Sequence, residues 1–120
     1  MNNIEKKELD VNFDPLSPDN IDVFNLHQRR DHELKINARY FKQIKEGLKR
    51  AEFRRADRDF QLGDFLTLRE FNSLPPQVGY TGRTVIAQIT DIVLVNDLYI
   101  ELRGKPDFVM LSFSIIHIKE

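Results

Sequence analysis

The spacing of hydrophobic and polar residues predicts one helix and several short strands. Residues 32–36 alternate polar and apolar side chains, which predicts a strand with Leu34 and Ile36 facing inward. Residues 38–47 repeat apolar side chains at the helical period and predict an amphipathic helix, which Gly47 can end in the left-handed conformation. The apolar side of this helix is expected to comprise Tyr40, Phe41, Ile44 and Leu48.

The rest of the chain favours strands joined by turns. Residues 72–83 contain two prolines and two glycines, so they are expected to form a loop. The strands are expected at 51–55, 65–71, 84–95, 99–102 and 109–118. One main helix with five or six strands indicates an α+β, mainly β fold, in the form of a small closed or nearly closed β-barrel.

The first 31 residues differ in character from those that follow. They are acidic and contain two prolines, yet they carry too many apolar side chains for a purely disordered tail. Ser17 and Pro18 favour the start of a short helix. We therefore expect an acidic N-terminal extension at residues 1–31, docked on a domain formed by residues 32–120.

Composition excludes several kinds of chemistry. The 120 residues include no cysteine, which removes disulfides, thiolate zinc sites, iron–sulfur clusters and a cysteine nucleophile. The three histidines, His27, His32 and His117, show no spacing typical of metal ligands, so neither a metal nor another cofactor is expected. No stretch is long and apolar enough to span a membrane, and residues 1–10 lack the apolar run of a signal peptide. These features predict a cytoplasmic protein without a membrane partner.

Charge is distributed unevenly along the chain, although its formal net value is only −1. Between Lys35 and Arg58 the sequence has nine basic and three acidic residues, which gives 9 − 3 = +6. A concentrated positive segment on a nearly neutral protein favours a polyanionic or phosphate-bearing partner. The alternative is that these side chains only solvate one face of the predicted helix.

The segment Gly47–Arg54 has the pattern G-x-K-x-x-E-x-R, where the predicted helix passes into a strand. In an extended segment Glu52 and Arg54 project to one face, and Phe53 projects to the other, where it is expected to enter the core. With Lys49 on the preceding turn, the motif offers cationic donors for phosphate or carbonyl oxygens and one carboxylate acceptor. The alternative is an ion pair between Glu52 and Arg54 on the strand surface.

This motif resembles the signature of the ASCH domain family, a branch of the PUA-like superfamily. From about His32 to Ile115 the chain also resembles the small bacterial ASCH-type proteins grouped as DUF3850, through blocks that include Asp57–Phe60 and Gly79–Arg83. The resemblance implies a PUA-like β-barrel whose cleft accepts RNA or a nucleotide-like small molecule. The family's cleft residues correspond to Lys49, Glu52 and Arg54.

The same resemblance implies an enzymatic alternative. Some ASCH proteins are small amidohydrolases that act on cytidine acylated at its exocyclic amine, using a lysine, a threonine nucleophile three residues later and a glutamate. Lys49 matches the lysine, but Glu52 occupies the threonine position. A hydrolytic mechanism here would therefore use Glu52 as general base on water, with Lys49 or Arg54 stabilising the oxyanion.

Further candidate residues lie outside the motif. Tyr80 and Arg83 are expected at a loop tip, where they would stack on a base and contact a phosphate. Arg58 and Arg69 are second-rank candidates for the cleft. The sequence thus predicts an RNA- or nucleotide-binding domain. One alternative is an amidohydrolase of acylated nucleosides, and another is a protein-interaction module whose acidic extension covers the basic cleft.

Overall fold

The computed structural model describes residues 29–120, so the short helix expected from Ser17 lies outside the described residues. Its elements are, in chain order, β1 (Asp31–Asn37), α3 (Ala38–Lys45), β2 (Ala51–Arg55), β3 (Phe65–Asn72), β4 (Gly79–Leu94), the 3-10 helices η2 (Val95–Asp97) and η3 (Ile100–Leu102), and β5 (Phe108–Lys119). The five strands form one sheet in the order β1-β3-β4-β5-β2. Strands β1 and β3 are parallel, and every other neighbouring pair is antiparallel.

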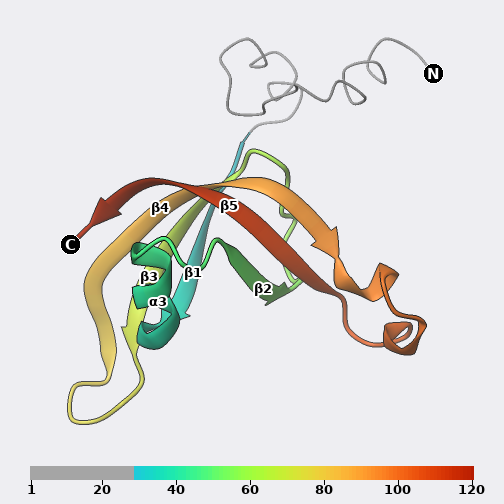
Figure 1. Cartoon of the computed structure of the whole chain (residues 1–120). Coiled ribbons are helices and arrows are strands. Elements are labelled where there is room, and N and C mark those ends of the chain that lie inside the picture. The colour runs from blue at the N-terminus through green and yellow to red at the C-terminus, as the bar shows by residue number, and fades with distance from the viewer. Residues whose placement is uncertain (1–28) are drawn as a thin grey trace, which may run out of the picture.

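The sheet curls around α3 as half of a barrel (Figure 1). The long strands β4 and β5 bend over the helix, which lies on the hollow side of the sheet. The described residues therefore confirm a mainly β fold with one main helix, but the sheet forms a half-barrel and not the closed or nearly closed barrel that the sequence predicts, because β1 and β2 do not pair.

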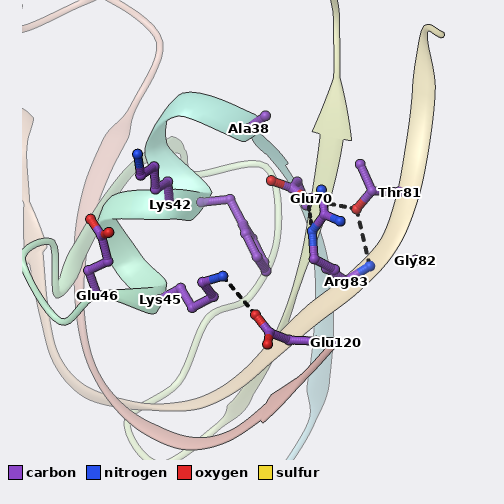
Figure 2. A pocket seen from close by; sticks show the side chains of 10 residues that line it. Ala38, Lys42, Lys45, Glu46, Glu70, Thr81, Gly82, Arg83 and Glu120 are labelled. Atoms are coloured by element: carbon purple, nitrogen blue, oxygen red, sulfur yellow. Dashed lines mark hydrogen bonds and ion pairs between the residues drawn. The ribbon is translucent and has the colours of Figure 1, made fainter.

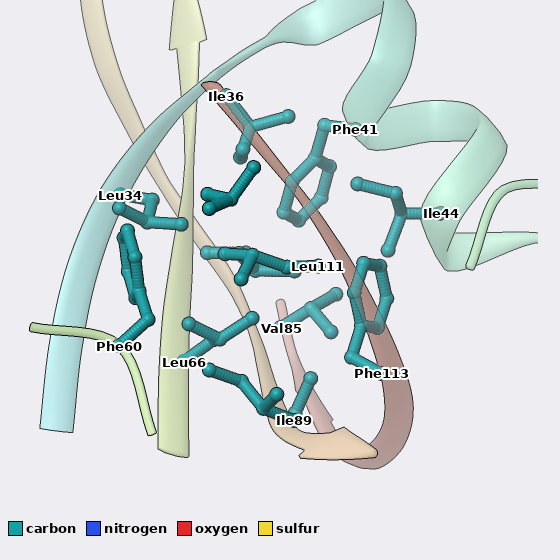
Figure 3. Packing of buried hydrophobic residues seen from close by; sticks show 13 residues of the cluster. Leu34, Ile36, Phe41, Ile44, Phe60, Leu66, Val85, Ile89, Leu111 and Phe113 are labelled. Atoms are coloured by element: carbon teal, nitrogen blue, oxygen red, sulfur yellow. The ribbon is translucent and has the colours of Figure 1, made fainter. Parts of the chain in front are cut away.

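The core lies between α3 and the concave face of the sheet (Figure 3). Leu34 and Ile36 are buried, as the alternation in β1 predicts, and Phe41 and Ile44 meet them from the helix. The remaining buried apolar residues are Phe60, Leu66, Leu68, Val85, Ala87, Ile89, Val109, Leu111 and Phe113. Because side chains alternate along a strand, the residues between these positions form a separate outer face.

The helix is shorter than the sequence predicts. Asn37 caps its start by accepting a hydrogen bond from a backbone N–H of the first turn, and Gly47, at a φ of 79°, turns the chain away after Lys45. The expectation that Tyr40 and Leu48 belong to its buried side is wrong, since they are 44% and 78% exposed. An eight-residue helix buries only a narrow stripe against the sheet, and these two positions fall outside it.

Two further expectations about elements are wrong. The loop predicted at 72–83 ends early, because β4 already begins at Gly79 and pairs Tyr80 with Phe71 across an irregular register. Its glycines, typical of a turn, here occupy positive φ values within the strand, as at a bulge. The strand predicted at 99–102 is instead the short helix η3.

Buried polar groups tie the start of β1 to the turn before β3. The Asp64 carboxylate is fully buried, and its Oδ2 lies 2.7 Å from Nε2 of His32. The same carboxylate accepts hydrogen bonds from the backbone N–H groups of Arg30 and Gln61, each at 3.0 Å. His32 therefore has the structural hydrogen-bonding role expected of a buried histidine.

Arginine side chains join the two edges of the half-barrel. Strands β1 and β2 are the outermost strands and do not pair with each other. Arg54 donates from Nη1 to the backbone oxygen of Lys35 at 3.2 Å, and Arg58 donates from Nη1 to that of Glu33 at 2.8 Å. These bonds cover the open edge of β1, which would otherwise present unpaired carbonyls, and they bring the Gly47–Arg54 motif beside it.

Candidate functional site

The three charged residues of the motif lie together, and Glu52 forms with Arg54 the ion pair that is the alternative to a binding role. Nζ of Lys49 lies 3.2 Å from Oε1 of Glu52, and Nη1 of Arg54 lies 3.3 Å from Oε2 of the same carboxylate. The Glu52 side chain is only 12% exposed, whereas the two cationic side chains are 26% and 28% exposed. We call these three residues the motif triad. Its formal charge is +1, and both cations remain reachable from solvent.

Local structure explains how the triad assembles. Gly47 reverses the chain after α3, and the backbone N–H of Lys49 bonds back to the helix at the carbonyl of Gln43. The register of β2 on β5 places Glu52 opposite Leu111 and Arg54 opposite Val109. Because Leu111 and Val109 are buried, the triad occupies the inner face of the half-barrel at its open edge.

Phe53 does not enter the core, contrary to the sequence prediction. Its side chain is 50% exposed and stacks on Phe108, with ring centroids 5.4 Å apart. The reason is the strand face: Glu52 and Arg54 of β2 face inward, and Phe53 faces outward. A hollow of about 370 Å³ beside this pair is lined by Phe53, Arg54, Arg55, Asp57 and Phe108.

An aromatic ring extends the triad towards α3. Nζ of Lys49 lies 5.8 Å from the ring centroid of Tyr40, and it also donates to the backbone oxygen of Ala51. Tyr40, which the sequence assigns to the core, is thus a partly exposed surface ring next to the motif. The sequence carries no signal of this position, because the helix that it predicts is longer than the eight-residue α3, which leaves the ring uncovered.

The other predicted site residues fall into two groups outside the triad. Arg69 pairs with the Glu33 carboxylate at 2.8 Å and lies over the Tyr80 ring at 3.8 Å. Arg58 joins this group through its bond to the backbone of Glu33. Arg83 pairs instead with Glu70 on the inner face of the sheet. Neither Tyr80 nor Arg83 lies at a loop tip, because both belong to β4.

A groove of about 770 Å³ runs between α3 and the Arg83–Glu70 pair (Figure 2). The Glu70 side chain, 8% exposed, accepts from Nε of Arg83 at 2.6 Å and from the hydroxyl of Thr81 at 2.7 Å. On the other side of the groove Glu120 accepts from Nζ of Lys45 at 2.7 Å. This hydrogen bond, followed by the charge of Lys45, holds the pKa of Glu120 below its usual value.

The groove does not extend the basic surface that the sequence predicts. Its charged lining consists of three cations and three carboxylates: Lys42, Lys45, Arg83, Glu46, Glu70 and Glu120. Of these residues the sequence analysis names only Arg83 as a candidate, as a phosphate contact at a loop tip. The remaining members come together only when β4 and the end of β5 fold over α3.

Two negative findings apply to the described residues. Within residues 29–120 no group of three His, Asp or Glu side chains is placed to hold a metal ion. In the same part of the chain, no helix has the length and apolar character that crossing a membrane requires.

These features define a mainly β half-barrel domain with a charged triad at its open edge. Residues 31–113 match the family described as "Domain of unknown function (DUF3850)", and the chain belongs to that family. The chain is also similar to the "Uncharacterized 12.9 kDa protein in GpA 3'region" of Escherichia phage P2, with 47% identity over 66 residues. That alignment covers 55% of this chain and 57% of the phage protein. The resemblance to DUF3850 is thereby confirmed.

Proposed function

We propose that this protein is an ASCH-type, PUA-like domain that binds RNA or a nucleotide-like ligand at the motif triad. The observation that carries the proposal is the convergence of Lys49 and Arg54 on Glu52 at the open edge of the half-barrel. The family description names no activity, so the argument rests on the chemistry of these side chains. The absence of cysteine is consistent with action in the cytoplasm.

The cations of the triad have donors to spare. Among residues 29–120, Arg54 bonds to Glu52 and to the backbone oxygen of Lys35, in both cases through Nη1. Its Nε and Nη2 are therefore left to bind a ligand. A guanidinium that is already oriented in this way suits phosphate or carbonyl oxygens. Glu52 would accept from the exocyclic amine of a base, and the Tyr40 ring would offer a face for stacking.

Charge around the triad favours a polyanion. The segment from Lys35 to Arg58 has a formal charge of +6, and the described structure places most of its basic side chains in solvent. Such a surface attracts phosphates and releases their counterions on binding, so affinity depends strongly on salt.

The proposal is tested by fluorescence anisotropy with short single-stranded RNA. The double variant Lys49→Gln with Arg54→Gln is expected to lose about tenfold or more in affinity and to lower the slope of log K against log salt by about 1.4, since each lost phosphate contact removes about 0.7. The matched control is Arg103→Gln with Lys105→Gln, two exposed cations on the distant turn before β5. Unchanged affinity in the triad variant, or a flat salt dependence in the wild type, would refute the proposal.

The distance between Lys49 and Glu52 also supports a second candidate, hydrolysis of an acylated nucleoside. Glu52 would remove a proton from water as the oxygen attacks the acyl carbon, and it would pass this proton to the exocyclic nitrogen as the C–N bond breaks, which releases the carboxylic acid and the neutral base amine. Incubation with cytidine acylated at its exocyclic amine, followed by mass spectrometry, tests this reaction. Release of product by the wild type and not by Glu52→Gln would support it, whereas intact substrate after long incubation would exclude it.

A further inference from the structure

The outer face of the sheet carries a row of cations that crosses four strands. The strand registers align Lys35 of β1 with Arg69 of β3, Arg69 with Thr84 of β4, and Thr84 with Lys119 of β5. Residues directly opposite each other project to the same face of a sheet. Three of the four positions in this row are therefore cationic, on the face turned away from the core.

An aromatic row lies directly beside the cationic one. Phe71 and Tyr80 are opposite each other on β3 and β4, and their rings meet edge to face at 5.1 Å. Nζ of Lys35 lies 4.5 Å from the Phe71 centroid, and the Arg69 guanidinium lies 3.8 Å from the Tyr80 centroid. We call these four residues together with Lys119 the outer platform.

The platform is held in place before any ligand arrives. The Glu33 carboxylate fixes Nη1 of Arg69 at 2.8 Å, so the guanidinium plane stays against the Tyr80 ring. Arg58 in turn holds the backbone of Glu33. Tyr80 nevertheless remains 47% exposed. Ordered aromatic and guanidinium faces that remain in contact with water lose little conformational entropy when a planar group stacks on them.

We infer that the outer platform binds single-stranded RNA, with bases stacked on Tyr80 and Arg69 and phosphates along the cationic row. This inference rests on the proposed function and deepens it, because it adds a second contact surface and specifies unpaired bases. Neighbouring strands are about 4.8 Å apart, so the row from Lys35 to Lys119 spans roughly 14 Å. Sheet faces with aromatic residues bind two or three bases over a comparable width.

The chemistry of the platform favours RNA over a protein partner. It has three cations, and the Glu33 carboxylate beside them is already paired with Arg69. Its rings sit between cations, an arrangement that suits alternating bases and phosphates. A duplex hides its bases from stacking, so discrimination between single and double strands is part of the inference.

Substitution of Tyr80 tests the stacking directly. Tyr80→Ala is expected to weaken binding of a short single-stranded RNA by about 5- to 100-fold, the range measured when one stacking residue is removed. The double variant Lys35→Ala with Lys119→Ala is expected to reduce the salt slope by about 1.4. The matched controls are Tyr99→Ala, at a tyrosine before η3 that is also about half exposed, and Lys105→Ala, and both should bind as the wild type.

A fluorescent variant keeps the test independent of folding defects. The chain contains no tryptophan, so Tyr80→Trp introduces a single reporter with a larger stacking surface. Its emission should be quenched as single-stranded RNA is added, with affinity at least equal to that of the wild type. An unquenched reporter in a protein that binds the RNA would overturn the inference.

The outcomes separate this inference from the proposed function. Weaker binding in the Tyr80 variant, with normal binding in the Lys49 and Arg54 variant, supports the platform and refutes the triad as the site. The reverse pattern refutes the platform alone. Absence of RNA binding in the wild type refutes both, and equal affinity for single-stranded RNA and its duplex refutes the stacking that the platform requires.

Discussion

The two faces of the half-barrel use similar residue types for different purposes. On the inner face, phenylalanine and leucine side chains pack against α3, and the carboxylates of Asp64 and Glu70 each receive two or more hydrogen bonds from neighbouring groups. On the outer face, aromatic rings and cations stack on one another in contact with water.

This difference separates residues needed for folding from residues free for binding. A buried ring contributes by filling space, and its loss leaves a cavity. A surface ring between two cations fills no cavity, so its stabilisation is small and its face stays open to a ligand. The contrast can be measured with one residue type, because Phe41 belongs to the inner face and Phe71 to the outer face.

The largest expected effect is the loss of stability on replacing Phe41. Phe41 is 1% exposed between α3 and the sheet, so Phe41→Ala should lower the free energy of unfolding by about 3–5 kcal/mol. Phe71→Ala removes the same atoms from the outer face and should cost only about 1 kcal/mol. Urea denaturation followed by circular dichroism measures both, and equal losses would contradict the separation of the two faces.

A smaller effect is expected at the buried carboxylate of Asp64. Asp64→Asn keeps the shape but removes the charge that faces His32, and it turns an amide donor towards groups that themselves donate. The free energy of unfolding should fall by about 2–3 kcal/mol. Asp59→Asn, a nearby exposed carboxylate, is the control and should change stability by less than about 0.5 kcal/mol. A loss at Asp59 as large as that at Asp64 would show that burial does not set the effect.

Much of the inner face is predictable from the sequence. Alternation in β1 identifies Leu34 and Ile36, and helical periodicity identifies Phe41 and Ile44, because both patterns report burial directly. Phe53 is misassigned for the same reason: hydrophobicity predicts burial, but β2 lies at the sheet edge with its polar face inward.

The candidate sites are only partly predictable. The motif triad is local in sequence: strand alternation places Glu52 and Arg54 on one face, and the resemblance to the ASCH family adds Lys49. The outer platform depends on the registers among four strands, including the irregular pairing of Tyr80 with Phe71. Those registers follow from tertiary packing, and no spacing within a single segment contains them.

The smallest expected effect concerns Glu120, at the rim between the two faces. Its pKa is lowered in the folded protein by the hydrogen bond and then the charge of Lys45, with a further contribution from Arg83. A lowered carboxyl pKa stabilises the fold above the unfolded pKa, and this stabilisation is lost as the pH falls through the folded pKa. Lys45→Met should therefore raise the pKa of Glu120 in a carboxyl NMR titration and weaken the acid dependence of stability.

The control is Lys42→Met, which changes a lysine of the same helix that also lines the groove. It should leave the pKa of Glu120 unchanged. An equal response to both variants would assign the shift to the general charge of the helix and not to the Lys45 hydrogen bond.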